Sequence, residues 1–487
     1  MIPAAAVEPH RVAFVTGRLA EPSLRRLLAD MAPPFAYEVI VLRITVAALM
    51  TTAWIAEHLQ ARDVPEGTDL VLIPGLCEGE PDVVSNRLGS EKLGVRVEKG
   101  PKDLREIPQY FGRAAAARDY GAWDIEILAE INNAPRLTRS ALRGAADYFR
   151  ASGADLIDVG CTPGLGFPEL GEVVRELVAA GMRVSVDTFD PDEIRVAVAA
   201  GAELVLSVNG SNIEVAQELA GTGARVVVVP DLGSTLETLE PSLEKLTRWG
   251  IRYLIDPILE PIGLGFMASL ERYAEVRRRY PQAEMLMGIG NLTELTAADS
   301  TGVNAMMIAI CQELGVRAVL TTEVIPWARG AVREVDIARR LMRYAVAGHT
   351  IPKGVDDRLV TVKDPEILAF TEQELRALQA DITDPNFRIF ADREAITVLN
   401  NERFIRTTDV ARIGDIFAQL DVDEPAHAFY LGKELARASL AVSLGKTYRQ
   451  EGSLSWGYLT PPDDAKAEHV RLTYRSTRAD PADGSDA

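Results

Sequence analysis

Residues 184–212, VSVDTFDPDEIRVAVAAGAELVLSVNGSN, contain a complete strand–helix–strand repeat. An apolar strand over 184–188 is followed by an amphipathic helix over 191–200 and by a second apolar strand over 204–209. The Gly-Ala pair after the helix is the expected stop signal before the next strand. Continuous apolar strands separated by helices indicate a parallel sheet that is covered on both faces.

The same repeat occurs on both sides of this stretch. The predicted strands are 125–131, 156–160, 184–188, 204–209, 226–230, 253–257, 285–289 and 318–323. Eight successive strand–helix units predict a TIM barrel, in which functional side chains lie where each strand meets the following loop.

The chain has 487 residues, which is too long for one ordinary domain. We expect an N-terminal Rossmann-like α/β domain over 1–122, the TIM barrel over 123–350, a C-terminal α+β domain over 351–474 and a disordered polar tail over 475–487. No Gly-x-Gly-x-x-Gly follows the first N-terminal strand, so the sequence gives little support for a nucleotide site there.

Composition excludes several classes of function. The net charge of −19 argues against nucleic acid or an anionic membrane surface as the main partner. The 3 cysteines and 5 histidines are scattered, without disulfide or zinc-ligand spacing, so we expect a cytoplasmic protein. The most apolar run, residues 44–56, is too short to span a bilayer.

Four amide or carboxylate side chains lie at or just past the ends of predicted strands: Asp187, Asn209, Asp256 and Asn291. Such residues are common turn formers, which is the alternative for any one of them. Asp187 and Asp256, however, fall within apolar strands. A carboxylate in a barrel mouth needs partners that offset its desolvation, and a neutral heterocycle with several N–H donors supplies them.

Residues 184–212 resemble the pterin-binding family, which contains dihydropteroate synthases and methyltetrahydrofolate:corrinoid methyltransferases. GADLIDVGCTPG (153–164) and YLIDPILEPIG (253–263) resemble the strand-two and strand-six segments of the synthases. The resemblance implies that Asp256 pairs with the 2-amino and N3 positions of a pterin. It also implies that Asp187 and Asn209 hold the other edge of the ring.

The resemblance also suggests a diphosphate region. Asn132 matches the strand-one Asn that helps hold Mg²⁺ on the substrate diphosphate in the synthases. Asp158 and Thr162 belong to the strand-two part of this region. Arg329 and Arg333 are candidates to replace the synthase cations, and a solvated helix face is the alternative for both.

The chain also departs from the synthases. GIGNLTEL (288–295) lacks the synthase Lys after strand seven, and Gly290-Asn291 is more similar to the methyltransferases. The Arg-x-His motif after strand eight is absent as well. The combination, together with residues 427–458, resembles the dihydropteroate synthase-like proteins of tetrahydromethanopterin-using archaea and methylotrophic bacteria.

This resemblance implies a transferase of C1 metabolism that acts in tetrahydromethanopterin biosynthesis. It would join a dihydropterin-CH2-diphosphate to the aryl amine of a ribofuranosyl-aniline phosphate. Two alternatives stay open: methyl transfer from a methylated pterin to a corrinoid, and a non-catalytic pterin-binding subunit. A corrinoid would need a partner protein, because the chain has no DxHxxG motif. A homodimer is also left open.

Overall fold

The computed structural model describes residues 9–460, except 91–93, 113–119, 235 and 366–369. The chain divides into two compact units, Met1–Val355 and Asp356–Ala487. A parallel sheet, a closed barrel and an antiparallel sheet follow one another along the sequence, which confirms the predicted fold class. The predicted domain limits remain predictions, and the predicted tail lies outside the described residues.

The N-terminal sheet is parallel and has the strand order β2-β1-β3-β4. Its strands are β1 (Arg11–Thr16), β2 (Ala36–Val41), β3 (Leu70–Ile73) and β4 (Arg96–Lys99). The helices are α1 (Glu21–Met31), α2 (Thr52–His58), α3 (Pro81–Leu88) and α5 (Ile107–Tyr110), with 3₁₀ turns η1 (Ala47–Leu49), η2 (Ala61–Asp63) and η3 (Leu104–Glu106). The sequence did not predict β4, because an edge strand that reads RVEK carries little apolar signal.

The barrel is closed by pairing of its last strand with its first. Its strands are β5 (Glu126–Ile131), β6 (Leu156–Gly160), β7 (Arg183–Asp187), β8 (Leu204–Val208), β9 (Arg225–Val228), β10 (Tyr253–Ile255), β11 (Glu284–Gly288) and β12 (Ala318–Thr321). Each predicted barrel strand overlaps one of them.

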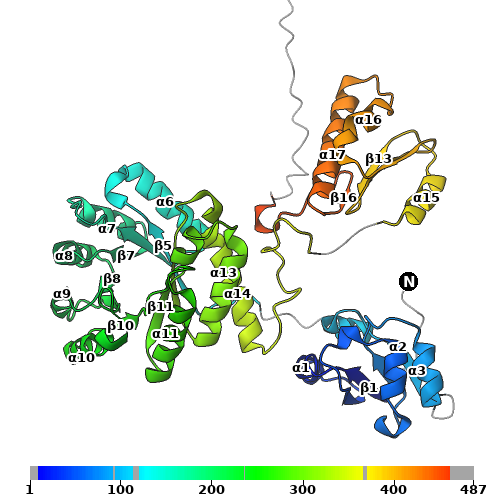
Figure 1. Cartoon of the computed structure of the whole chain (residues 1–487), viewed down its shortest axis with the longest axis horizontal. Coiled ribbons are helices and arrows are strands. Elements are labelled where there is room, and N and C mark those ends of the chain that lie inside the picture. The colour runs from blue at the N-terminus through cyan, green and yellow to red at the C-terminus, as the bar shows by residue number, and fades with distance from the viewer. Residues whose placement is uncertain (1–8, 91–93, 113–119, 235, 366–369, 461–487) are drawn as a thin grey trace, which may run out of the picture. The chain divides into compact units, whose positions relative to one another are not determined.

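Helices surround the barrel strands (Figure 1). They are α6 (Arg139–Ser152), α7 (Leu170–Ala179), α8 (Pro191–Ala200), α9 (Glu214–Glu218), α10 (Leu239–Trp249), α11 (Phe266–Arg279), α12 (Gly290–Glu294), α13 (Ser300–Leu314) and α14 (Ala331–Ala347). The 3₁₀ turns are η4 (Ala134–Arg136), η5 (Leu236–Thr238) and η6 (Pro326–Ala328).

Local sequence fixes the ends of these helices. The Asp190 carboxylate accepts the first free backbone N–H groups of α8, and Gly201 ends the helix in the left-handed conformation, with φ +111°.

The interior of the barrel is layered along the strands. Alternate residues of a strand face the interior, so Glu126, Leu128 and Glu130 of β5 contribute to successive layers. The middle layer is apolar and includes Leu128, Leu156, Leu204, Leu254 and Leu286. Two residues beyond these leucines, toward the carboxyl ends of β5, β6 and β10, come Glu130, Asp158 and Asp256. The polar layer at this end therefore consists largely of carboxylates.

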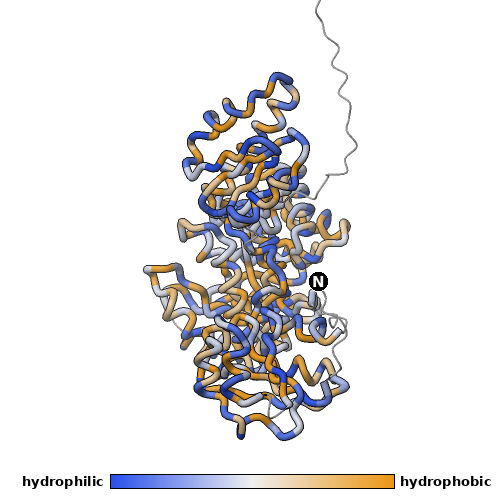
Figure 2. The backbone as a smooth tube through the Cα atoms, turned by 90° about the vertical axis from the view of Figure 1, so that its right-hand side faces the viewer, coloured by the Kyte–Doolittle hydropathy of each residue, from blue (hydrophilic) through white to orange (hydrophobic). Residues whose placement is uncertain are grey.

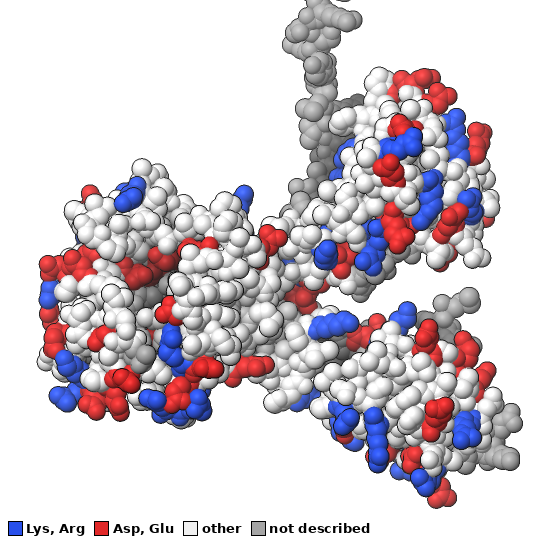
Figure 3. Space-filling model, viewed as in Figure 1, with Lys and Arg blue, Asp and Glu red and all other residues white. Residues whose placement is uncertain are grey.

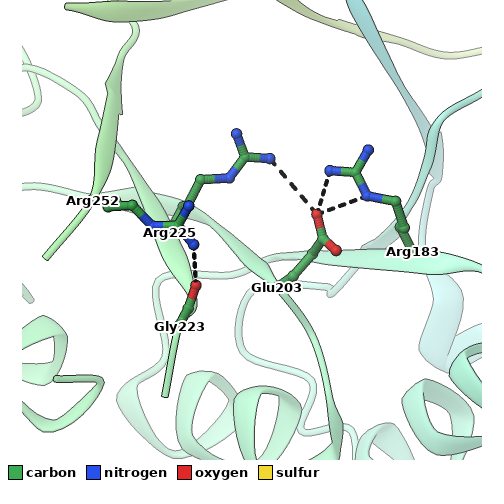
Figure 4. Close-up of a pocket in the computed structure, with 5 residues that line it drawn as sticks. All are labelled: Arg183, Glu203, Gly223, Arg225 and Arg252. Carbon is green, nitrogen blue, oxygen red and sulfur yellow. Dashed lines mark hydrogen bonds and ion pairs between the residues drawn. The ribbon is translucent and has the colours of Figure 1, made fainter. Parts of the chain in front are cut away.

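An ion-pair network occupies the opposite, amino-terminal end of the strands. Arg183 binds Glu126 and Glu203 at 2.7 and 2.5 Å, and Arg225 binds Glu126 at 3.1 Å. A pocket of about 320 Å³ lies at this end, and Arg252 also lines it (Figure 4). Because Arg183 and Arg225 are paired with carboxylates from several strands, the network ties the strand starts together, as expected for this end of a TIM barrel.

Arg339 of α14 connects the outer helices to the start of the barrel. Its side chain is 2% exposed and forms an ion pair with Asp336 at 2.8 Å and another with Asp155. Its guanidinium also donates to the carbonyl oxygens of Ile125, at 2.7 Å, and Gly153, at 3.1 Å. This buried charge is therefore fully partnered.

The C-terminal unit contains an antiparallel sheet with the order β15-β14-β13-β16. Its strands are β13 (Arg388–Ala391), β14 (Ile396–Leu399), β15 (Phe404–Thr407) and β16 (Tyr448–Arg449). Its helices are α15 (Glu372–Asp381), α16 (Ile413–Ala418) and α17 (Pro425–Ser443), with turns η7 (Val410–Arg412) and η8 (Gly457–Leu459). Side chains of α17 share a core with β13 and β14, which gives the predicted α+β arrangement.

Within the described residues, no helix combines the length and apolar character needed to cross a bilayer. Hydrophobic and hydrophilic stretches alternate over short distances along the chain (Figure 2). On the face seen in Figure 3, Lys and Arg are interspersed with Asp and Glu. That face carries no continuous basic stripe of the kind that follows a nucleic acid backbone.

Candidate functional site

Three carboxylates meet at the carboxyl ends of neighbouring strands. One oxygen each of Glu130 (β5), Asp158 (β6) and Asp187 (β7) lies within 4.8 Å of the others. The strand register brings them together, because Glu130 pairs with Asp158 and Gly160 pairs with Asp187. A Cβ atom on Gly160 would lie 2.7 Å from Glu130 Oε1, so glycine at this position leaves room for the Glu130 carboxylate. We call Glu130, Asp158 and Asp187 the acidic cluster.

The acidic cluster has few hydrogen-bond donors. Asp158 is fully buried; Ser185 Oγ donates to its Oδ1 at 2.6 Å, but its Oδ2 has no partner. The Asp187 side chain accepts no hydrogen bond from any residue that the structure describes. Glu130 accepts one hydrogen bond, from Asn132 Nδ2 at 2.9 Å.

Burial and repulsion from nearby carboxylates raise the pKa of all three carboxyls. The pKa of Asp158 rises well above its usual value, first through burial and then through Asp187 and Glu130. Burial and the neighbouring carboxylates raise the pKa of Glu130 to about 7, and burial and Asp256 raise that of Asp187 to about 6. The cluster therefore favours a ligand that brings protons, N–H donors or positive charge.

Asp256 directly follows β10, and only one of its two carboxylate oxygens accepts hydrogen bonds from the described residues. Its Oδ1 accepts hydrogen bonds from the Tyr273 hydroxyl at 2.5 Å and from the backbone N–H of Ile258 at 2.7 Å. Its Oδ2 accepts none from the described part of the chain. Burial raises the pKa of Asp256 to about 6, although both donors act in the opposite direction. The carboxylate is therefore fixed in orientation, with Oδ2 available to a ligand.

Asn209 sits in a tightly bonded loop after β8. Its Oδ1 accepts from the backbone N–H and the hydroxyl of Ser211, at 2.9 and 2.6 Å, and its own backbone N–H donates to Asn212 Oδ1 at 2.9 Å. The side chain is 7% exposed, and its Nδ2 donates to none of the described residues. The loop therefore positions an amide N–H₂ group beside the barrel mouth.

Asn291 is the second residue of α12, directly after β11. Its Nδ2 donates to the Leu259 carbonyl oxygen at 3.1 Å, in the loop that also carries Asp256. The side chain is otherwise exposed. The structure thus links Asn291 to the strand-six loop.

Asn132 and Thr162 also lie at this end of the barrel. Asn132 Oδ1 accepts from the Thr322 hydroxyl at 2.5 Å, while its Nδ2 donates to Glu130. The Thr162 hydroxyl donates to Asn133 Oδ1 at 3.1 Å, which joins the loops after β5 and β6. Asn132 therefore orients a member of the acidic cluster.

The two predicted cations are not brought to the acidic cluster. Arg329 and Arg333 are exposed, and neither forms an ion pair or hydrogen bond with a carboxylate of the cluster or with Asp256. Arg329 lies near enough to Tyr148 to lower the pKa of that phenol, against the larger effect of burial. Their role as replacement cations stays a prediction.

Sequence reasoning missed three residues of this site: Glu130, Glu294 and Tyr273. Glu130 lies two residues after the interior-facing Leu128, and that spacing could have identified it. Glu294 Oε1 is buried without a partner, and its charge raises the pKa of Glu130. Tyr273, which is fully buried on α11, gave no local signal, because only the fold brings it to Asp256.

Exposed apolar side chains lie on the loops that follow the barrel strands. They are Leu165, Phe189, Leu232, Ile262, Leu264, Leu295 and Trp327. Functional TIM-barrel sites form from these loops. The carboxyl-terminal end of the barrel therefore combines the acidic cluster with exposed apolar side chains.

Comparisons with known proteins match two parts of the chain. Residues 138–240 match a family described as "Pterin binding enzyme", and residues 10–102 match a family of unknown function, DUF6513. An uncharacterized protein of Methanocaldococcus jannaschii is 27% identical over 533 residues, covering 92% of this chain and 99% of that protein.

Solved structures similar to this chain include dihydropteroate synthases. The Yersinia pestis enzyme is 19% identical, covers 46% of this chain and 95% of its own, and has a TM-score of 0.37. The Coxiella burnetii enzyme is 18% identical, covers 46% and 93%, and has a TM-score of 0.37. The family match lies within the closed eight-stranded barrel, so residues 138–240 of the barrel are similar to pterin-binding enzymes.

Proposed function

We propose that the barrel mouth binds a reduced pterin between Asp187, Asn209 and Asp256. The observation that supports this most directly is the set of carboxylate oxygens without protein donors. Asp256 Oδ2 accepts from no donor among the described residues, and the 2-amino and N3 groups of a pterin would give it two adjacent N–H partners. The Asp187 carboxylate and Asn209 Nδ2 would take the other edge of the ring.

We propose further that the protein is a dihydropteroate synthase-like transferase. The substrates would be a dihydropterin-CH2-diphosphate and the aryl amine of a ribofuranosyl-aniline phosphate, as in tetrahydromethanopterin biosynthesis. The bond from the pterin methylene carbon to the diphosphate oxygen breaks, and the amine nitrogen bonds to that carbon and loses a proton. Carboxylates beside the ring would stabilise positive charge on the pterin, so orientation and electrostatics supply the catalysis.

The diphosphate imposes a condition on this reaction. The mouth contains Glu130, Asp158, Asp187, Asp256 and Glu294, and a diphosphate would meet repulsion there. Mg²⁺ on the diphosphate, or Arg329 and Arg333 after a loop movement, would have to neutralise it. If Mg²⁺ provides this neutralisation, the synthase reaction depends on a divalent cation; if the two arginines provide it, the reaction does not.

Methyl transfer is a second candidate, favoured by Asn291. A methylated pterin carries no diphosphate, so the acidic mouth presents no repulsion. An amide at the strand-seven position could hydrogen-bond to the pterin as its charge changes on loss of the methyl group. The acceptor would be a corrinoid on a partner protein. If neither reaction occurs, the barrel would be a non-catalytic pterin-binding subunit.

One experiment separates these functions. The full-length protein is incubated with 6-hydroxymethyl-dihydropterin diphosphate and the aryl amine, with and without Mg²⁺, and diphosphate release is measured. Pterin binding is measured in parallel by calorimetry. Release above an Asp256→Asn control supports the synthase, whereas binding without release rejects it and directs attention to methyl transfer. A folded protein that binds no pterin would overturn the proposal as a whole.

A further inference from the structure

The acidic cluster has no counter-charge among the residues that the structure describes. Within the described ranges, no Lys or Arg forms an ion pair with Glu130, Asp158 or Asp187. Two more carboxylates, Glu294 and Asp256, lie close enough to raise the pKa of Glu130 and of Asp187, respectively. Such a concentration of negative charge in a largely buried site is unfavourable unless something compensates it.

The geometry of the acidic cluster suits a single cation. Its three oxygens lie within 4.8 Å of one another. Oxygen ligands lie about 2.1 Å from Mg²⁺ and about 2.3–2.6 Å from Ca²⁺, so two ligands on opposite sides of one ion are separated by about 4–5 Å. Carboxylates from three adjacent strands could therefore bind the same ion without a change in the backbone.

A separate observation points to a missing ligand at this place. Asp158 is fully buried, and its Oδ2 has no hydrogen-bond partner. Buried polar atoms in folded proteins are rarely left without a partner, and an exception commonly marks a bound ion or water. Its other oxygen is held by Ser185, so the carboxylate cannot rotate away to satisfy Oδ2 without losing that bond.

We propose that Glu130, Asp158 and Asp187 bind one divalent cation of the hard, oxygen-preferring class, with Mg²⁺ and Mn²⁺ as the best candidates. The proposal does not depend on pterin binding. It also differs from direct binding by Asn132, because Asn132 Oδ1 already accepts from Thr322 and its Nδ2 donates to Glu130. Asn132 would act as a positioning residue that orients the Glu130 carboxylate toward the ion.

The test uses the full-length protein, dialysed against EDTA and free of pterin. Mn²⁺ is titrated at about pH 8, because a metal binds deprotonated carboxylates, and the free ion is followed by electron paramagnetic resonance. We expect one saturable site in the wild type. Glu130→Gln and Asp158→Asn should each weaken it at least tenfold. Mg²⁺ should displace Mn²⁺ from the same site.

Asp231→Asn is the matched control. Asp231 follows β9 on the same face but outside the acidic cluster, and asparagine keeps an oxygen that can accept from the Gly210 N–H. This variant should bind Mn²⁺ like the wild type. Circular dichroism melts establish that each variant is folded, and Glu130→Gln, at a partly exposed position, stands in if Asp158→Asn does not fold.

Three results would overturn the proposal: no saturable site in the wild type, a site unaffected by Glu130→Gln and Asp158→Asn, or equal loss in Asp231→Asn. Absence of a saturable site would mean that protons bound to the three carboxyls, and not a metal ion, neutralise the acidic cluster. Because no pterin is present, each of these results leaves the pterin proposal standing, and failure of pterin binding would leave the metal result standing.

Discussion

Replacing Asp256 by asparagine should weaken pterin binding while stabilising the ligand-free protein. The Tyr273 hydroxyl and the Ile258 N–H both donate to Oδ1, so the asparagine must turn its oxygen toward them. Its amide N–H₂ group then occupies the position of Oδ2 and faces the N–H donors of the pterin. The charge-assisted contact is lost and replaced by a contact between donors.

The affinity change follows from this loss. Hydrogen bonds to charged groups contribute about 1.5–3 kcal/mol, which corresponds to a rise in Kd of about 10- to 150-fold. We would measure it by isothermal titration of 6-hydroxymethyl-7,8-dihydropterin at pH above 7. Asp231→Asn serves as the control, with an unchanged Kd.

The stability change has the opposite sign. Burial raises the pKa of Asp256 from 3.8 to about 6, so the folded state holds this proton more tightly than the unfolded state does. The contribution of Asp256 to the free energy of unfolding therefore falls as pH rises from about 4 to 6, by about 3 kcal/mol at about 1.4 kcal/mol per pH unit. Asparagine does not titrate, so the variant should be the more stable protein at neutral pH and nearly equal to the wild type below about pH 4.

Urea denaturation in EDTA across this pH range measures the difference. A Kd within threefold of the wild type would refute the proposed contact with the pterin. A variant that is less stable than the wild type at neutral pH would refute the inference that ionised Asp256 destabilises the folded protein.

Three further substitutions, one of them with a matched control, test the surrounding structure. Tyr273→Phe removes a donor from Asp256 and should lower the free energy of unfolding by about 1.5–3 kcal/mol in urea denaturation; an unchanged midpoint would contradict the hydrogen bond. Gly160→Ala places a methyl group 2.7 Å from Glu130 Oε1 and should cost about 1–3 kcal/mol, whereas Gly144→Ala, in open space on α6, should be neutral or stabilising by up to about 1 kcal/mol. If both alanines behave alike, the close approach at Gly160 is wrong. Arg339→Met leaves Asp155 and Asp336 without their shared cation and should cost about 3–5 kcal/mol; a loss below about 1 kcal/mol in the same assay would show that water replaces the guanidinium.

The barrel was predictable because its strands are short, apolar and separated by helices that end in glycine. The predicted strand at 156–160 coincides with β6, and the other predicted limits differ from the observed ones by a few residues. At β10 the difference arises because a polar residue ends the strand. Asp256 was expected inside its strand, but its side chain folds back on the Ile258 N–H, so β10 ends at Ile255.

The site was only partly predictable, because a search at the ends of predicted strands finds residues that follow a strand. It overlooks residues that lie inside a strand or on a helix. Glu130 lies inside β5, where a charged residue at an interior position has no visible partner in the sequence. Tyr273 and Glu294 reach the site from helices, at positions that depend on how α11 and α12 pack. Alternation along the strand could have identified Glu130, but no local pattern could have placed the other two.

The backbone conformation of Ile258 affects the entropy of ligand binding at Asp256. Its φ of +66° is in the left-handed region, which β-branched residues rarely adopt and which costs about 1–3 kcal/mol. Its N–H donates to Asp256 Oδ1, its carbonyl oxygen accepts from Arg272, and its side chain packs against the apolar barrel layer. The loop is thus ordered before any ligand arrives, and the conformational entropy of fixing the Asp256 carboxylate is lost on folding. Ligand binding at this site would not cause that entropy loss again. Preorganisation of the carboxylate therefore increases affinity without additional contacts.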